Sequence, residues 1–227
     1  CHDNLTLWDK LQVSVPKASK KDKIAMNKLA AAITFTSQGT PFLQAGEEFL
    51  RSKPVKNKEE KYSANSYNLP DSVNSLKWDT LSEHKDVYEY YKGLIAFRKE
   101  HKSLRMTEAK DVQDNLVFQD TSGKGSVIAY TIENSLNGEV AEEIMVVHNG
   151  NAEDVEIALP DKDTWSIYIN GEKAGTEPIE EVTGSVHVDK ISTVVLVKES
   201  QKSKALKVIQ KTDICIYLSI GIVVLIL

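Results

Sequence analysis

The stretch Cys1-His2-Asp3-Asn4-Leu5-Thr6-Leu7-Trp8-Asp9 opens the chain and decides how the rest is interpreted. It has no initiator methionine and no leading segment, so we expect it to lie within a fold that starts further upstream. Its His-Asp-Asn triplet places an imidazole, a carboxylate and a carboxamide side by side, groups that suit a polyhydroxylated ligand. The same residue types also occur in plain turns, so the triplet alone leaves both interpretations open.

The composition is that of an ordinary globular protein. The 227 residues are 41% hydrophobic and 27% charged, which allows one large domain or two small ones. A net charge of −5, without a basic block carrying aromatic residues, argues against a nucleic-acid partner. Cys1 and Cys215 lie at opposite ends and indicate neither a disulfide framework nor a Cys/His metal cluster.

Two segments of the first hundred residues have helical periodicity. Residues 23–35 are rich in alanine and are followed by a stop at Gly39, and residues 86–102 end in basic side chains that complement the helix dipole. Between them, residues 40–46 are a short apolar run that predicts a buried strand. The order of these elements predicts a βα unit that feeds a parallel strand, and hence an α/β fold.

A long irregular segment, residues 52–82, lies between the predicted strand and the second helix. A loop of this length in a compact domain is either functional or disordered. Its aromatic, amide and carboxylate side chains suit stacking on sugar faces and bonding to hydroxyl groups. A solvated insertion, fastened to the surface by its aromatic residues, is an equal alternative.

The chain changes character after Ser103. Seven β-rich runs follow, several of them separated by Asn-Gly turn signals: 116–119, 126–132, 143–148, 155–159, 165–169, 185–188 and 193–197. Their spacing predicts an all-β unit, an antiparallel β-sandwich. His148 and His187 lie in strand patterns, and we assign them structural roles. The predicted divisions are an α/β part at 1–103, the sandwich at 104–198, a polar linker at 199–213 and an apolar tail at 214–227.

Three motifs in the chain carry a resemblance to a known family. They are His2-Asp3-Asn4 followed by Thr6–Leu11, then Gly39–Arg51, and then Asn65–Asn68 followed by Asp71–Asn74. Their order and spacing closely resemble the C-terminal part of type I pullulanases, in the α-amylase superfamily (glycoside hydrolase family 13). The resemblance covers roughly residues 1 to 198. It implies the last strands and helices of a (β/α)₈ TIM barrel, followed by an antiparallel β domain.

The resemblance also implies roles for particular residues. Family members are retaining hydrolases, with a carboxylate nucleophile after strand four and a carboxylic acid/base after strand five. Neither lies in this chain. Asp3 matches the third catalytic carboxylate, and His2 and Asn4 match neighbouring substrate-binding positions. Tyr67, Asn68 and Asp71 fall where related enzymes bind glucose units further from the cleaved bond.

The implied activity is cleavage of α-1,6-glucosidic branch bonds in pullulan, glycogen or starch-derived dextrins. Because two of eight strands cannot close a barrel, we predict that these 227 residues alone are inactive. Isoamylase-like or α-amylase-like specificity is one alternative. A non-catalytic carbohydrate-binding surface module is another.

The expected partner is an α-glucan. We expect no cofactor, although the acidic pairs Glu47-Glu48 and Asp71/Asp79 could coordinate calcium. The tail is shorter than the ~20 residues of a membrane span. The segment from Ile209 weakly resembles a degraded sortase-type anchoring signal, which leaves membrane or cell-wall association open. We expect an extracellular or cell-surface protein of a Gram-positive-type bacterium, with the cytoplasm as the alternative.

Overall fold

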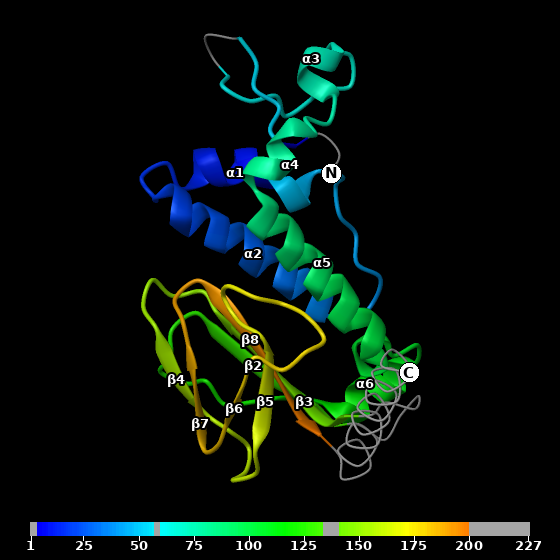
Figure 1. The fold of residues 1–227 in the computed structure, drawn as a ribbon, viewed down its shortest axis with the longest axis vertical. Coiled ribbons are helices and arrows are strands. Elements are labelled where there is room, and N and C mark those ends of the chain that lie inside the picture. Colours follow the sequence, from blue (N-terminus) through cyan, green and yellow to red (C-terminus); the bar gives the residue numbers. More distant parts are fainter. Residues whose placement is uncertain (1–3, 57–59, 134–140, 200–227) are drawn as a thin grey trace, which may run out of the picture.

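The computed structural model describes residues 4–56, 60–133 and 141–199. One layer consists of the helices α1 (Leu7–Ser14), α2 (Lys20–Thr36) and α5 (Lys85–Glu100) (Figure 1). The hydroxyl oxygens of Thr6 and Ser19 accept backbone N–H groups at the starts of α1 and α2, as N-cap residues do. The helices predicted at 23–35 and 86–102 are therefore confirmed with slightly different ends.

A six-stranded antiparallel sheet forms the next layer. Its strands lie in the order β1 (Leu116–Phe118), β2 (Val127–Glu133), β3 (Ala141–Asn149), β8 (Ser192–Glu199), β5 (Trp165–Ile169) and β6 (Glu180–Val182). A two-stranded antiparallel sheet joins β4 (Val155–Ala158) to β7 (Ser185–Val188). The seven predicted runs all correspond to strands. The sequence analysis did not predict β6. This edge strand contains the charged residues Glu180 and Glu181 and so lacks the apolar pattern of the other strands.

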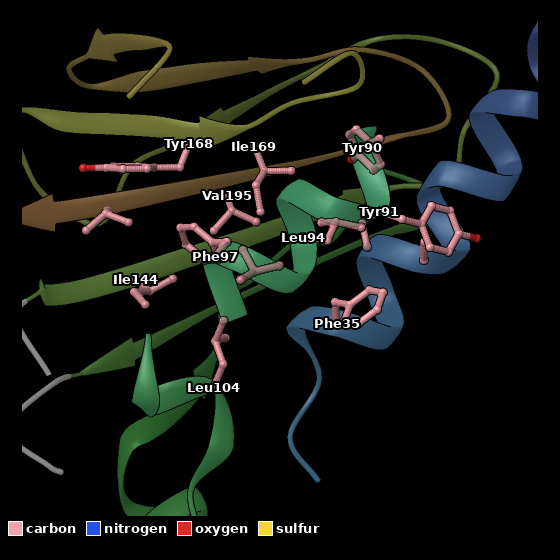
Figure 2. Packing of buried hydrophobic residues seen from close by; sticks show 14 of the residues in the cluster. Phe35, Tyr90, Tyr91, Leu94, Phe97, Leu104, Ile144, Tyr168, Ile169 and Val195 are labelled. Carbon is pink, nitrogen blue, oxygen red and sulfur yellow. The ribbon is translucent and has the colours of Figure 1, made fainter. Parts of the chain in front are cut away.

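The six-stranded sheet is covered on both faces. One apolar cluster lies between the helices and the sheet, where Phe35, Tyr91, Leu94 and Phe97 meet Ile144, Tyr168, Ile169 and Val195 (Figure 2). A second cluster lies between the sheet and the β4–β7 pair, around the fully buried Trp165. Because apolar side chains fill both interfaces, helices and strands share a continuous core.

Arg98 also ties the helices together at their far ends. Its guanidinium donates to the carbonyl oxygens of Phe35 and Ser37, both at 2.8 Å, and of Gly39 at 2.5 Å. These carbonyls lie at the end of α2 and just beyond it, where helical partners are missing. The sequence predicts that Arg98 complements the dipole of its own helix; the structure shows it binding the end of α2.

The prediction of a strand at residues 40–46 is wrong. These residues are irregular, Phe42 is 76% exposed, and the chain turns at Gly46, whose φ is 100°. An extended segment becomes a strand when a neighbour supplies its hydrogen bonds, and all strand pairs in the described residues are antiparallel. The predicted parallel βα unit is likewise not formed, and a portion of a TIM barrel is not shown by this structure.

The resemblance also implies the end of a barrel strand at the opening stretch, whose first three residues lie outside the described part of the chain. Leu7 begins α1, and the residues before it that the structure describes are not in a strand. Residues 52–82 are largely irregular, as predicted, with the short helices α3 (Asp71–Asn74) and α4 (Asp79–Glu83). The remaining helical segments are η1 (Glu47–Phe49), η2 (Lys102–Arg105) and α6 (Ala109–Asn115).

The predicted apolar tail lies outside the described residues. Within the described part of the chain, no helix combines the length and apolar character needed to cross a bilayer.

Gly93 brings α5 against the loop that follows β5. A Cβ at this position would lie 2.0 Å from the carbonyl oxygen of Ala174 and 2.4 Å from its carbonyl carbon. We expect Gly93→Ala to lower the free energy of unfolding by about 2 kcal/mol, because overpacking of about 3 kcal/mol exceeds alanine's helix preference of about 1 kcal/mol. Urea unfolding of the two chains measures the difference.

Gly175 supplies the matched control, because a Cβ there would meet nothing within 4 Å. We expect Gly175→Ala to change stability by about 0.5 kcal/mol or less. Equal stability of the Gly93→Ala variant and the original chain would contradict the close approach of helix and loop.

Candidate functional site

The structure describes four of the six sequence-predicted site residues. His2 and Asp3 lie outside the described residues. Asn4 is exposed, and its Oδ1 accepts the backbone N–H of Leu5 at 2.8 Å. Tyr67, Asn68 and Asp71 are exposed together on the long loop, with Tyr67 84% exposed. The structure therefore groups the three loop residues, and it leaves their relation to His2 and Asp3 undescribed.

Asn74 holds the backbone around the three loop residues. Its Nδ2 donates to the carbonyl oxygens of Ser66 at 2.7 Å and Leu69 at 2.9 Å, which flank Tyr67 and Asn68. Asp71 begins α3 directly after Pro70. Because the backbone is fixed on both sides, the phenol, the carboxamide and the carboxylate all project from one frame into solvent.

Two basic residues hold this loop in place through hydrogen bonds. Arg51 donates from Nη1 to the carbonyl oxygen of Ala45 at 3.0 Å and from Nη2 to that of Asn74. Lys53 Nζ donates to Ser66 Oγ at 2.7 Å. Burial lowers the pKa of Lys53, and the nearby Arg51 charge lowers it further. These contacts make the loop a supported structure rather than a loose insertion.

Asp9 joins the loop to the opening stretch of the chain. Its side chain is fully buried at the start of α1, where Oδ1 accepts Ser52 Oγ–H at 2.5 Å and Oδ2 accepts the Lys53 backbone N–H at 2.7 Å. A buried carboxylate is retained when hydrogen bonds replace its water. Sequence reasoning included Asp9 in a family motif without assigning a role; only the fold shows that it positions the loop.

We expect Asp9→Ala to destabilise the loop relative to the rest of the chain. The change leaves the Lys53 N–H and the Ser52 hydroxyl without their acceptor, at a cost of about 2 kcal/mol. Limited proteolysis should therefore cut faster within residues 52–82, and urea unfolding should report the loss of stability. Ser52→Ala, which removes one of the two bonds, should cost about 1 kcal/mol. A protease pattern unchanged by Asp9→Ala would contradict this role.

An aromatic pair joins the loop to the segment before it. The rings of Phe49 and Trp78 have centroids 5.5 Å apart; Phe49 is buried and Trp78 is 63% exposed. Phe49 thereby supports a broad indole face that remains accessible to solvent. The sequence signal was the aromatic content of the loop, which did not single out Trp78 as a site residue.

The acidic pairs considered for calcium have different surroundings. Burial raises the pKa of Glu47, whereas Glu48 accepts the Gly46 backbone N–H at 2.9 Å. Asp71 and Asp79 are exposed at the starts of two separate short helices. Among the described residues, the group of three side chains close enough to share an ion is Asp154, His187 and Asp189, far from these pairs in sequence.

The described part of the site thus offers groups for binding. Exposed aromatic faces suit the apolar faces of sugars, while amide and carboxylate groups suit their hydroxyls. These groups therefore suit the binding of a polyhydroxylated ligand.

Comparisons with known proteins find relatives along most of the chain. Residues 112–173 match the family model "Pullulanase, all-beta domain". A curated relative, pullulanase from Bacillus subtilis strain 168, is 32% identical over 195 residues, which cover 86% of this chain and 26% of that protein. The crystal structure of type I pullulanase from the same strain, complexed with maltose, matches with a TM-score of 0.78 at 31% identity, over 88% of this chain and 26% of that one.

Two further proteins extend the comparison. The structure of pullulanase from Bacillus acidopullulyticus matches with a TM-score of 0.80 and 38% identity, over 87% of this chain and 23% of that one. Isoamylase from Pseudomonas amyloderamosa is 29% identical over 165 residues, which cover 67% of this chain and 20% of that protein. The chain therefore spans about a quarter of the length of these Bacillus pullulanases.

Proposed function

We propose that a full-length protein carrying this chain is a debranching glycoside hydrolase of the α-amylase family. The premise is that the chain is similar to pullulanases over most of its length, and that residues 112–173 match their all-beta domain. The proposed reaction is hydrolysis of α-1,6-glucosidic branch bonds in pullulan, glycogen or starch-derived dextrins. The observation that carries the proposal is 32% identity to a pullulanase across 86% of the chain, a stretch that includes the described loop.

We propose a retaining mechanism in which this chain supplies binding and electrostatic groups. The nucleophile and the general acid/base would come from a preceding part of the protein. Asp3 would hold hydroxyl groups of the ring at the cleavage point, and these bonds strengthen as the ring distorts toward an oxocarbenium ion. His2 would bind the same ring, and Asn4 the sugar on the leaving-group side.

The long loop would bind glucose units further from the cleaved bond. Tyr67, Asn68 and Asp71 are exposed, and hydrogen bonds from Asn74 fix the backbone that carries them. Both observations support this role. The Bacillus subtilis relative was solved with maltose, an α-glucoside of the class proposed here as ligand. An uncharged glucan also agrees with the absence of a basic surface signature in the sequence.

We further propose that the helical layer is completed by preceding residues into a (β/α)₈ barrel. Large apolar side chains stay exposed in this part of the chain, with Phe42 76%, Ile33 42% and Ile95 41% exposed. An open cavity of about 390 Å³, lined by Leu43, Tyr91 and Ile95 among others, lies beside α5. Exposed apolar surface of this kind is usually covered by another part of the protein.

The test is hydrolysis of pullulan by two purified proteins. The full-length product of the gene should release maltotriose, and the 227-residue chain should release none, because the nucleophile and acid/base are missing. A full-length protein that leaves pullulan, glycogen and branched dextrins intact would overturn the proposal. Maltotriose release by the 227-residue chain alone would overturn the assignment of the missing groups.

The same assay separates the alternative specificities. Isoamylase-like specificity, favoured by the 29% identity to an isoamylase, would show as cleavage of glycogen branches with little action on pullulan. Cleavage of α-1,4 bonds would instead leave pullulan products that retain an α-1,6 bond. Activity measured after chelation would test whether calcium is needed. Fractionation of the source cells would test the proposed extracellular or surface location.

A further inference from the structure

Three side chains of the β unit point at a common position on its surface. Asp154 lies just before β4, His187 lies in β7, and Asp189 follows that strand. His187 Nε2 is 3.6 Å from Asp154 Oδ2 and 3.5 Å from Asp189 Oδ1. One donor atom from each residue lies within 4.8 Å of the other two. We propose that Asp154, His187 and Asp189 bind a divalent transition-metal ion such as Zn²⁺.

The distances suit such an ion. Zinc bonds to imidazole nitrogen and carboxylate oxygen at about 2.0–2.2 Å, so two ligands of a tetrahedral ion lie about 3.3 Å apart. The two measured histidine–aspartate separations exceed this value by a few tenths of an ångström. The two aspartate oxygens lie within 4.8 Å of each other. Side-chain rotations that close these three separations would bring all three donors into coordination, with further positions left for water.

Glu156 sets the orientation of the imidazole. His187 and Glu156 face each other across the β4–β7 ladder, and His187 Nδ1 is 2.9 Å from Glu156 Oε1. A carboxylate that accepts the Nδ1–H leaves Nε2 as the metal-binding nitrogen, an arrangement typical of metal-bound histidines. The nitrogen left free is the one that faces both aspartates.

The backbone that carries the ligands is fixed from below. The fully buried Asn149 donates from Nδ2 to the carbonyl oxygens of Glu153 at 2.9 Å, Val188 at 3.3 Å and Asp189 at 3.0 Å. These bonds join the residue before Asp154 to the last residue of β7 and to the residue that follows it. The ligand-bearing segments are thereby held together without any contribution from an ion.

The local charge also favours a cation. Three carboxylates, from Asp154, Glu156 and Asp189, surround one imidazole, so even a protonated ring leaves two negative charges uncompensated. The adjacent Lys190 directs its ammonium group to Asp22 at 3.1 Å. Lys124 donates to the backbone carbonyl of Glu156. The three proposed ligands have side chains between 51% and 59% exposed, so an ion can enter directly from solvent.

The competing role is a set of exposed ion pairs around a protonated His187, which would contribute little to stability. Calorimetric titration of the 227-residue chain with ZnCl₂ distinguishes the two. His187→Gln and Asp189→Asn should each weaken one binding event at least tenfold, and Glu156→Gln about tenfold. His84→Gln is the matched control and should leave that event unchanged, because His84 is not among the three proposed ligands.

Titration with Mn²⁺, which prefers nitrogen and oxygen ligands over thiols, provides an independent measurement. Paramagnetic broadening of amide resonances should concentrate at residues 154, 187 and 189, and Asp154→Asn should abolish it there while the other resonances keep their positions. Zinc affinity that is equal in His187→Gln and the original chain would overturn the proposal. So would broadening of the exposed acidic groups without preference for these three residues.

Discussion

Replacing Asp3 by asparagine in the full-length protein is expected to lower kcat on pullulan about a thousandfold. In the proposed mechanism, the Asp3 carboxylate bonds ring hydroxyls more strongly in the oxocarbenium-like transition state than in the bound substrate. Loss of about 4 kcal/mol of this differential binding corresponds to about three orders of magnitude in rate. Steady-state kinetics on pullulan measure the change, which should fall on kcat more than on KM.

Asp71→Asn is the matched control for Asp3→Asn, since both changes exchange one carboxylate for an amide. Asp71 is proposed to bind a glucose unit away from the reacting ring, so its replacement should raise KM and leave kcat nearly unchanged. If Asp3→Asn kept kcat, or if both variants changed only KM, Asp3 would have no part in stabilising the transition state.

Acidification is expected to destabilise the folded chain through His148. The side chain is 6% exposed at the contact between β3 and α2, with Nδ1 2.8 Å from Thr193 Oγ1 and Nε2 3.4 Å from Thr36 Oγ1. Burial lowers the pKa of His148 to about 4. The two hydroxyl groups satisfy a neutral ring and provide no negative charge for a protonated one.

Acid favours unfolding because His148 has a lower pKa in the folded chain than in the unfolded chain. The unfolded chain binds a proton at His148 near the ordinary histidine pKa of about 6.5, whereas the folded chain binds it near 4. As the pH falls from 7 to 4, the unfolded state gains the proton first, and the folded state loses about 3 kcal/mol of relative stability. Below about pH 3 both states are almost fully protonated, and this contribution stays constant.

His148→Gln isolates this contribution from those of the carboxylates. The difference in free energy of unfolding between pH 7 and pH 4, measured with urea, should be about 3 kcal/mol smaller in the variant. The carboxylates titrate in both proteins and cancel in the comparison. Identical pH dependence of the two proteins would show that the ring is already accessible to protons in the folded state.

Much of the fold could be predicted from residue patterns because local periodicity reflects local burial. The alanine-rich repeat of α2 and the aromatic repeat of α5 mark faces that are buried in the structure. The β runs were visible because the core strands combine β-branched residues with turn signals at their ends. Short elements such as β6 carry no such pattern, and their pairing with a neighbour makes them strands.

The candidate site could be predicted in part. Tyr67, Asn68 and Asp71 are close in sequence, and their exposure on one loop follows from their polarity and from the turn-forming residues around them. The supports of that loop come from distant positions: Asp9 is separated from Lys53 by 44 residues and Arg51 from Asn74 by 23. No local pattern identifies such pairs, since each partner alone resembles an ordinary polar surface residue.

The sequence alone determined the long helices, the antiparallel strands and the resemblance to pullulanases, because these depend on periodicity and on ordered motifs within short windows. The tertiary structure decided what depends on partners. Residues 40–46 have a strand-like composition, yet without a paired neighbour they stay irregular. An aspartate such as Asp9 is common in the first turn of a helix. Its burial and its role in holding the loop depend on the hydrogen bonds from Ser52 and Lys53. Hydrogen-bond partners and burial are properties of the assembled chain, so no single segment encodes them.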